Sequence, residues 1–96
     1  MLKTIINAIH NREHLSFTYS GLSRIVQPAA VGVSHAGNEV LRCYQTAGGH
    51  VTPGHEWDFC TLSNMSNLVA TGKCFVGNPP QYKRGDKGMS IVYAEL

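Results

Sequence analysis

The chain has 96 residues, of which 43% are apolar and only 15% are charged. This length supports one domain with one hydrophobic core, and the composition excludes a disordered chain. The net charge is +2 and the isoelectric point is about 8.5, which excludes the high Lys and Arg density of a chain dominated by phosphate contacts. A nucleic-acid role would therefore depend on a local patch, and Lys83, Arg84 and Lys87 could form either that patch or a solvated loop.

The cysteines and the apolar runs indicate the cellular compartment in which the protein is expected. Three cysteines, an odd number, lie in apolar or strand-like stretches typical of buried, reduced thiols: Cys43, Cys60 and Cys74. No run approaches the roughly 20 apolar residues that a membrane span needs, and Met1 leads directly into an amphipathic pattern without the apolar core of a signal peptide. We expect a cytoplasmic protein with no membrane contact.

The first predicted element is a short amphipathic helix at the start of the chain. Leu2, Ile5, Ile6 and Ile9 fall at positions i, i+3, i+4 and i+7, so they form one apolar stripe. A helix of about ten residues is marginal on its own. We therefore expect the stripe to pack against the face of a sheet.

After the helix the apolar period changes from helical spacing to alternation, which predicts strands. The expected strands are residues 15–20, 24–34, 39–45, 57–62 and 65–70. Pro28 has no N–H, so it should mark a bulge or an edge in a long, bent strand. Residues 46–55 contain three glycines and a proline and are predicted to form a loop.

Four or five short antiparallel strands in so small a chain must curl to protect their edges. The predicted fold class is mostly β (α+β), a small SH3-like or Sm-like antiparallel barrel of about five strands with an N-terminal helix. We place the helix and barrel in residues 1–75. Residues 76–96 would add a polar loop and a C-terminal docking segment to the same domain. The apolar end, residues 89–96, could form a further strand of this barrel or extend the barrel of a neighbouring copy.

Three segments follow the leading helix in a distinctive order: LSFTYSG (15–21), SRIVQPAAVGVSHAGNEVLRCYQT (23–46) and WDFCTLSNMSNL (57–68). This order resembles the WYL domain, a family of small Sm-like or SH3-like β-barrels, over about residues 2–71. Two departures stand out. The triplet that names the family falls on Glu39, Val40 and Leu41, so only the leucine is kept, and Asn64 stands where a basic residue is usual.

The resemblance implies ligand sensing. WYL domains usually follow a helix-turn-helix in bacterial transcription regulators, or lie beside defence and DNA-processing modules, and are thought to bind nucleic acids or nucleotides. Because the predicted helix begins at Leu2, we expect no helix-turn-helix before the domain. We therefore expect a stand-alone copy that acts in trans, as a dimer or on another protein.

Two arginines are the best candidates for holding an anionic ligand. Arg24 and Arg42 can each grip a phosphate with two N–H groups, while Tyr19, Tyr44 and Trp57 could offer surfaces on which a base stacks. In the alternative interpretation, both arginines extend from sheet edges into solvent and the aromatic residues belong to the core. The sequence leaves both interpretations open.

Catalytic and metal-binding patterns are weak. Cys60 is close in sequence to His55 and Asp58, but no nucleophile elbow precedes it, and Glu56 with Asp58 makes a poor acid–base pair. His50 and His55 lie five residues apart in a glycine-rich segment, without the spacing typical of zinc ligands. We expect no enzymatic activity, no cofactor and no metal.

Two functions from different classes therefore stand as predictions. The first is a non-enzymatic, ligand-sensing or regulatory domain that binds a nucleotide or single-stranded nucleic acid. The second is a protein-interaction module that forms a homodimer or joins a larger bacterial or phage complex. Salt separates them, because phosphate binding weakens steeply as salt rises.

Overall fold

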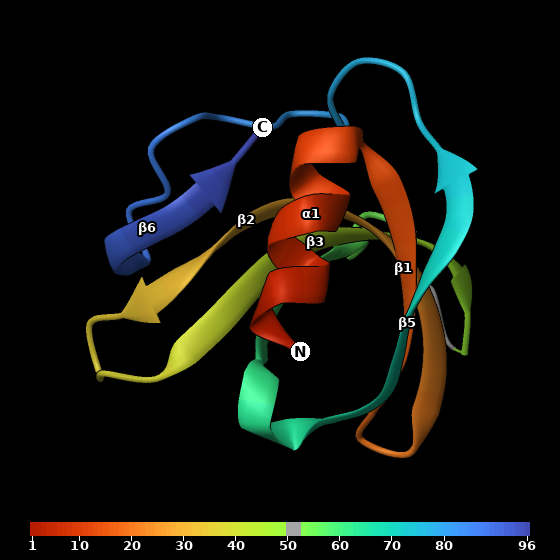
Figure 1. The fold of residues 1–96 in the computed structure, drawn as a ribbon, viewed down its shortest axis with the longest axis horizontal. Helices are drawn as coiled ribbons and strands as arrows, with labels where there is room; N and C mark the ends of the chain where they lie inside the picture. The colour runs from red at the N-terminus through yellow and green to blue at the C-terminus, as the bar shows by residue number, and fades with distance from the viewer. Residues whose placement is uncertain (50–52) are drawn as a thin grey trace.

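We describe the fold from a computed structural model, which covers residues 1–49 and 53–96. The elements are α1 (Leu2–Asn11), β1 (Glu13–Tyr19), β2 (Leu22–Ser34), β3 (Glu39–Gly48), β4 (Trp57–Thr61), the 3₁₀ helix η1 (Leu62–Asn64), β5 (Met65–Cys74) and β6 (Met89–Glu95). Figure 1 shows α1 beside a strongly curved antiparallel sheet. The predicted class, a small, mostly β, barrel-like fold with a leading helix, is confirmed, with six strands in place of about five.

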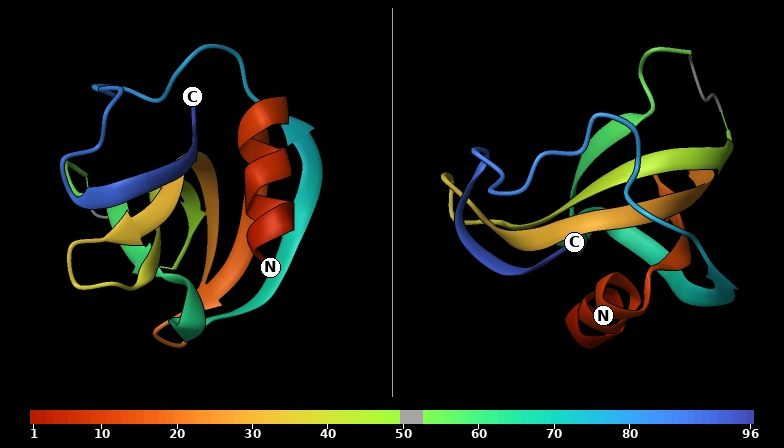
Figure 2. Two further views of the ribbon diagram at one scale, coloured as in Figure 1. Left: turned by 60° about the vertical axis from the view of Figure 1, so that its left-hand side comes forward. Right: turned by 90° about the horizontal axis from the view of Figure 1, so that it is seen from above.

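The sheet curls because its two outermost strands are consecutive in the chain. The strand order is β4-β3-β2-β1-β5, and only η1 connects β4 to β5. In a flat sheet, four spacings of about 4.8 Å would separate these strands by about 19 Å. The four residue steps from Thr61 to Met65 span at most about 14 Å. The sheet therefore bends into a barrel, whose curvature is visible in both views of Figure 2.

β2 is the longest strand, with 13 residues, and it pairs on both edges. One edge pairs with β3, while the other pairs first with β1, over residues 22–26, and then with β6, over residues 30–34. Pro28 lies between these two stretches, where its missing N–H breaks no ladder, and the register with β3 shifts between Pro28 and Ala30. Of the two alternatives predicted at Pro28, a bulge or an edge, the structure has the bulge.

Two strands are longer than the sequence indicated. β3 continues to Gly48, so residues 46–48 of the predicted loop belong to a strand. Gly48 pairs with Arg24, and a Cβ there would overlap the Ser23 carbonyl oxygen. The glycine thus marks a close approach of two backbones, and the loop predicted at residues 46–48 is wrong. β5 likewise continues to Cys74, which pairs with Glu13. Residues 50–52, including His50 of the predicted loop, lie outside the described residues.

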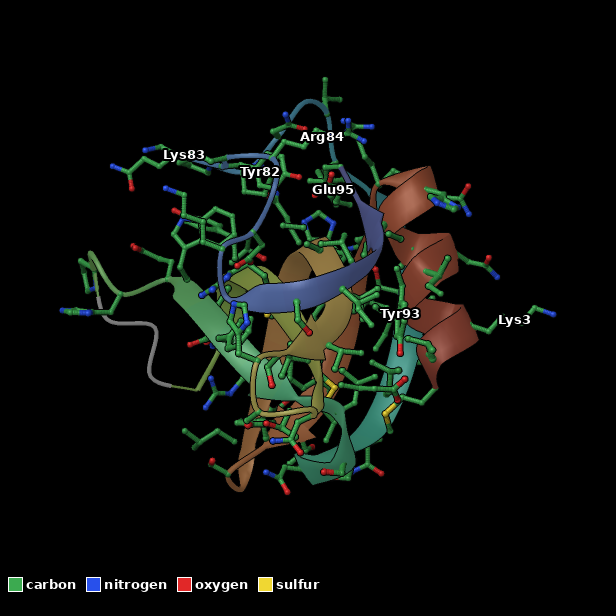
Figure 3. The ribbon with its side chains drawn as sticks, turned by 90° about the vertical axis from the view of Figure 1, so that its left-hand side faces the viewer. Lys3, Tyr82, Lys83, Arg84, Tyr93 and Glu95 are labelled. Carbon is green, nitrogen blue, oxygen red and sulfur yellow. The ribbon has the colours of Figure 1, made fainter. Side chains whose placement is uncertain are left out.

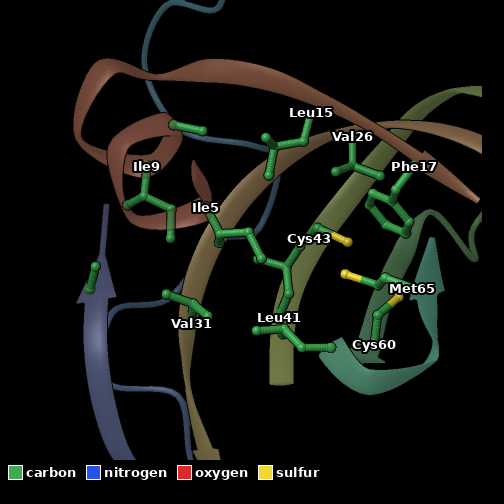
Figure 4. Packing of buried hydrophobic residues seen from close by; sticks show 13 residues of the cluster. Ile5, Ile9, Leu15, Phe17, Val26, Val31, Leu41, Cys43, Cys60 and Met65 are labelled. Carbon is green, nitrogen blue, oxygen red and sulfur yellow. The ribbon is translucent and has the colours of Figure 1, made fainter. Parts of the chain in front are cut away.

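α1 packs its apolar stripe onto the inner face of the sheet, as predicted. Ile5, Ala8 and Ile9 are buried, and Leu2 and Ile6 pack partly buried against the same cluster. Figure 4 shows Ile5 and Ile9 pointing toward side chains of β1, β2 and β3. The helix therefore fills the barrel interior that the strands leave open. No helix among the described residues is long and apolar enough to cross a membrane.

The cysteines differ in burial. Cys43 and Cys60 are buried in the core, as predicted, and their thiols form a hydrogen bond that, together with burial, raises the pKa of Cys43 well above its ordinary value. Cys74 is exposed, so its predicted burial is wrong. It is the last residue of β5, an edge strand that pairs with no further strand on its outer side in the described structure.

A testable prediction concerns Gly32, where β6 crosses β2. A Cβ at Gly32 would overlap the Ile91 carbonyl oxygen and come within 2.9 Å of the Val92 Cα. We expect Gly32→Ala to lower the free energy of unfolding by about 1–3 kcal/mol, the usual cost of overpacking, and to loosen β6 first. Chemical denaturation and amide hydrogen exchange in β6 measure both effects.

Gly49→Ala is the matched control, because the three atoms nearest to its added methyl group all belong to the Leu22 side chain, the first of them 3.1 Å away. An equal loss of stability in the two variants, or unchanged exchange in β6 of Gly32→Ala, would contradict the assigned contact.

Candidate functional site

A cavity of about 500 Å³ lies between β3, β4 and the segment that leads to β6. We call residues 75–88, which join β5 to β6, the strap. Arg42 and Trp57 line the cavity from the strands, and residues 81–88 line it from the strap. This volume falls in the range of small-molecule sites, about 300–1,000 Å³.

Arg42 is held by two contacts on the outer face of the sheet. Its guanidinium carbon lies 4.1 Å from the centre of the Phe59 ring, directly across from it on β4. Its Nε and Nη2 groups donate to the two carboxylate oxygens of Asp86, over 2.7 and 3.2 Å. The Gly88 N–H donates to the same carboxylate over 2.8 Å. The hydrogen bond from Arg42 lowers the pKa of Asp86 below its ordinary value.

Trp57 anchors the strap to β4. Its indole N–H donates to the Pro80 carbonyl over 3.0 Å, and its ring meets Tyr44 edge to face, with 5.4 Å between centroids. Tyr44 therefore supports the indole from the neighbouring strand. The middle of the strap is also tied to the end of the chain, because the Tyr82 hydroxyl donates to the Leu96 carbonyl over 3.1 Å.

The cavity carries an excess of positive charge. Arg84 pairs with Glu95 at 3.3 Å, and Asp86 is matched by Arg42. Lys83 and Lys87 are exposed, and neither forms an ion pair with any residue that the structure describes. Figure 3 shows Arg84 near Glu95, whereas Lys83 extends away from them. The basic patch considered at Lys83, Arg84 and Lys87 thus lines a concave surface.

Arg24 and Tyr19 lie elsewhere, away from the cavity. Arg24 pairs with Asp58 at 3.1 Å, with the two side chains 15% and 23% exposed, and its guanidinium lies 5.4 Å from the centre of the Tyr19 ring. The Tyr19 hydroxyl accepts a hydrogen bond from the Thr61 N–H over 3.1 Å. The Nε of Arg24 is buried without a hydrogen-bond partner in the described part of the chain. These contacts give Arg24 and Tyr19 internal partners.

The five predicted ligand residues therefore fall into two groups. Arg42, Tyr44 and Trp57 lie together on the outer face of β3 and β4, and two of them line the cavity. Consecutive strand residues point to opposite faces, so Asp58 and Phe59 lie on opposite faces of β4. Arg24 pairs with Asp58 and Arg42 contacts Phe59. The two arginines therefore also lie on opposite faces. One phosphate cannot contact both.

Sequence reasoning missed Asp86 and the strap. Asp86 lies 44 residues from Arg42, so no local pattern connects them. The available signal was an isolated acid among cations, between Gly85 and Gly88.

A smaller cavity of about 300 Å³ lies on another face, lined by His14, Ile25, Thr46, Thr71 and Lys73. It contains less charge than the strap cavity. Within residues 1–49 and 53–96, no three His, Cys, Asp or Glu residues gather where a metal ion could bind. Cys60 is buried and Asp58 is paired with Arg24, so neither is arranged as the nucleophile or orienting acid considered above.

We predict that Asp86 titrates below its ordinary pKa of 3.8, because protonation would break its contact with Arg42. Because the pKa of Asp86 is lower in the folded protein, the contact stabilises the folded strap at every pH above the pKa of the free carboxyl. This stabilisation is lost as the pH falls through the lower pKa of the folded protein. The contact should therefore persist from neutral pH to below pH 4. A carbon NMR titration of the Asp86 carboxyl checks this. Titration at or above the ordinary value contradicts it, and Arg42→Gln should return the value toward normal.

Comparison with known proteins adds no relative. No family model matches the chain, and neither the curated proteins nor the solved structures include a match. The resemblance to the WYL domain stays a prediction that depends on the order of its sequence landmarks.

Proposed function

We propose that this domain is a non-enzymatic binding module whose ligand carries phosphate, either a nucleotide or a single-stranded nucleic acid, and that the ligand occupies the strap cavity. The observation that carries the proposal is the combination of one indole ring with an excess of cations around a cavity of about 500 Å³. Stacking surfaces and cationic side chains are the two elements that such ligands require.

Each part of the cavity suits one part of the ligand. Lys83 and Lys87 are point charges that can attract phosphate from solvent, and Arg42 offers a planar fork that matches phosphate oxygens. Trp57 lines the same cavity, and an aromatic stack on one base is worth about 1–3 kcal/mol. Tyr44 packs edge to face against the indole ring and helps to hold it in place.

The pair Arg24 and Tyr19 has weaker support as a ligand site. Both side chains have internal partners, and replacing Arg24 would leave Asp58 unpaired at a largely buried position. A loss of binding after that replacement would mix structural damage with a lost contact. The two unpaired lysines are the cleaner positions for a test.

We predict that Lys83→Ala with Lys87→Ala weakens binding of a labelled single-stranded oligonucleotide by about 5- to 30-fold at low salt, because two exposed contacts of about 0.5–1 kcal/mol each are lost. The slope of log affinity against log salt should fall by about 1.4, at about 0.7 for each lost phosphate contact. Fluorescence anisotropy at several salt concentrations measures both quantities.

The matched control is Lys3→Ala with Lys73→Ala, which removes the same charge outside the strap cavity. Lys3 lies on α1 and is well separated from Lys83 in Figure 3, and Lys73 lines the smaller cavity. This control should retain most of the affinity. An equal loss in both double variants would show that net charge, and no particular cavity, determines binding.

β6 favours a second candidate function, a protein-interaction module that pairs with another copy. Ile91, Val92 and Tyr93 are consecutive and 54%, 37% and 42% exposed, on a strand without charge from residue 89 to 94. Edge strands that lack charge are prone to pair with further strands. In that case light scattering would show a dimer that persists at high salt and dissociates in Val92→Lys, and the oligonucleotide would not bind.

A further inference from the structure

We infer that Asp86 is a resident anion that the ligand must displace from Arg42, and that the ligand of this cavity is a mononucleotide with a terminal phosphate. The inference depends on the proposed function and names its ligand class. It separates two sources of phosphate, a terminal phosphomonoester and the phosphodiester of a nucleic-acid backbone.

Asp86 occupies the edge of Arg42 that a phosphate would use. Both carboxylate oxygens accept hydrogen bonds from this edge, over 2.7 and 3.2 Å, in the two-pronged geometry by which arginine binds phosphate. Phe59 covers one face of the same guanidinium. Arg42 is still 32% exposed in its side chain, against 10% for Asp86. An incoming anion can therefore reach Arg42 from solvent, but it must compete with Asp86.

The turn that contains Asp86 packs closely against Arg42. The Gly88 N–H donates to Asp86 over 2.8 Å, and a Cβ on Gly88 would lie 3.0 Å from the Arg42 Nη2 and 3.1 Å from an oxygen of Asp86. A side chain at this position would press on the ion pair. Glycine at this position therefore lets the strap pack closely against Arg42, because an added Cβ would require neighbouring side chains to shift by a few tenths of an ångström.

Charge decides which ligand displaces Asp86. A carboxylate and a phosphodiester each carry one negative charge. A phosphodiester that displaces Asp86 therefore brings no additional negative charge to Arg42. A phosphomonoester carries about 1.5–2 negative charges at pH 7 and presents three terminal oxygens. The additional charge meets Lys83 and Lys87, which have no anionic partner among the described residues. The cavity volume, about 500 Å³, also suits one nucleotide better than the extended groove that a strand needs.

Two probes with the same base separate these ligand classes. Adenosine 5′-monophosphate has a terminal phosphate, and adenosine 3′,5′-cyclic monophosphate has only a phosphodiester. Calorimetric titration of the wild-type protein should show at least tenfold tighter binding of the first. Equal affinity for the two probes would overturn the assignment of the ligand class.

Asp86→Asn tests the competition. Removing the resident charge should strengthen binding of both probes by about tenfold, the factor for one charged hydrogen bond of about 1.5 kcal/mol. Asp58→Asn is the matched control, because it makes the same substitution in the other arginine pair, outside the cavity, and should leave both affinities unchanged. Weaker binding by Asp86→Asn would make Asp86 a support for the strap and overturn its role as a competitor.

A measurement on the wild-type chain covers the case in which a variant does not fold. Saturation with adenosine 5′-monophosphate should shift the carboxyl carbon signal of Asp86 as its contact with Arg42 breaks. Binding without this shift overturns the inference and leaves the proposed function intact. If neither nucleotide nor oligonucleotide binds to the wild-type protein or to Asp86→Asn, the proposed function itself fails.

Discussion

The structure depends on β2 pairing along both of its edges. This strand is long enough to form one wall of the barrel with β1 and then, beyond Pro28, to receive β6 on the same edge. Proline lies where no partner needs its N–H, and Gly32 lies where the β6 backbone passes too closely for a side chain. Because β6 pairs far from the end of β5, the intervening strap must cross the outside of the sheet. The cavity is a consequence of that crossing.

Polar contacts then determine how the strap lies. Arg12 donates to Gly77 and Asn78 near its start, Trp57 donates to Pro80, and Arg42 binds Asp86 near its end. Each contact joins the strap to an element far away in the chain, so the strap is ordered by side chains and only sparsely by its own backbone. Such contacts are easier to exchange for a ligand than buried apolar packing, since an anion can replace a carboxylate without opening the core.

Features encoded by neighbouring residues could be predicted from the sequence. The stripe of α1, the alternation in β1 and the bulge at Pro28 all depend on spacing within a few positions, and the structure has each of them. The loop predicted at Gly48 is wrong, because glycine is equally typical of a close backbone approach and of a loop. The predicted site is divided between two faces of the sheet for a similar reason, because local spacing does not reveal how distant strands pair. Alternation places Arg24 and Arg42 on strand faces, but only the strand pairing shows that those faces are opposite.

The most direct test of the central claim, that ligand binds between Trp57 and the strap, uses the only tryptophan in the chain. Its indole N–H, bonded to Pro80, gives a single resolved signal in a nitrogen–proton NMR spectrum. On titration with adenosine 5′-monophosphate, this signal should move together with the backbone amides of residues 81–88, while the amides of Arg24 and Asp58 stay in place. An unmoved indole signal, with shifts gathered around Arg24 and Asp58, would contradict the claim and place the ligand on the opposite face of the sheet.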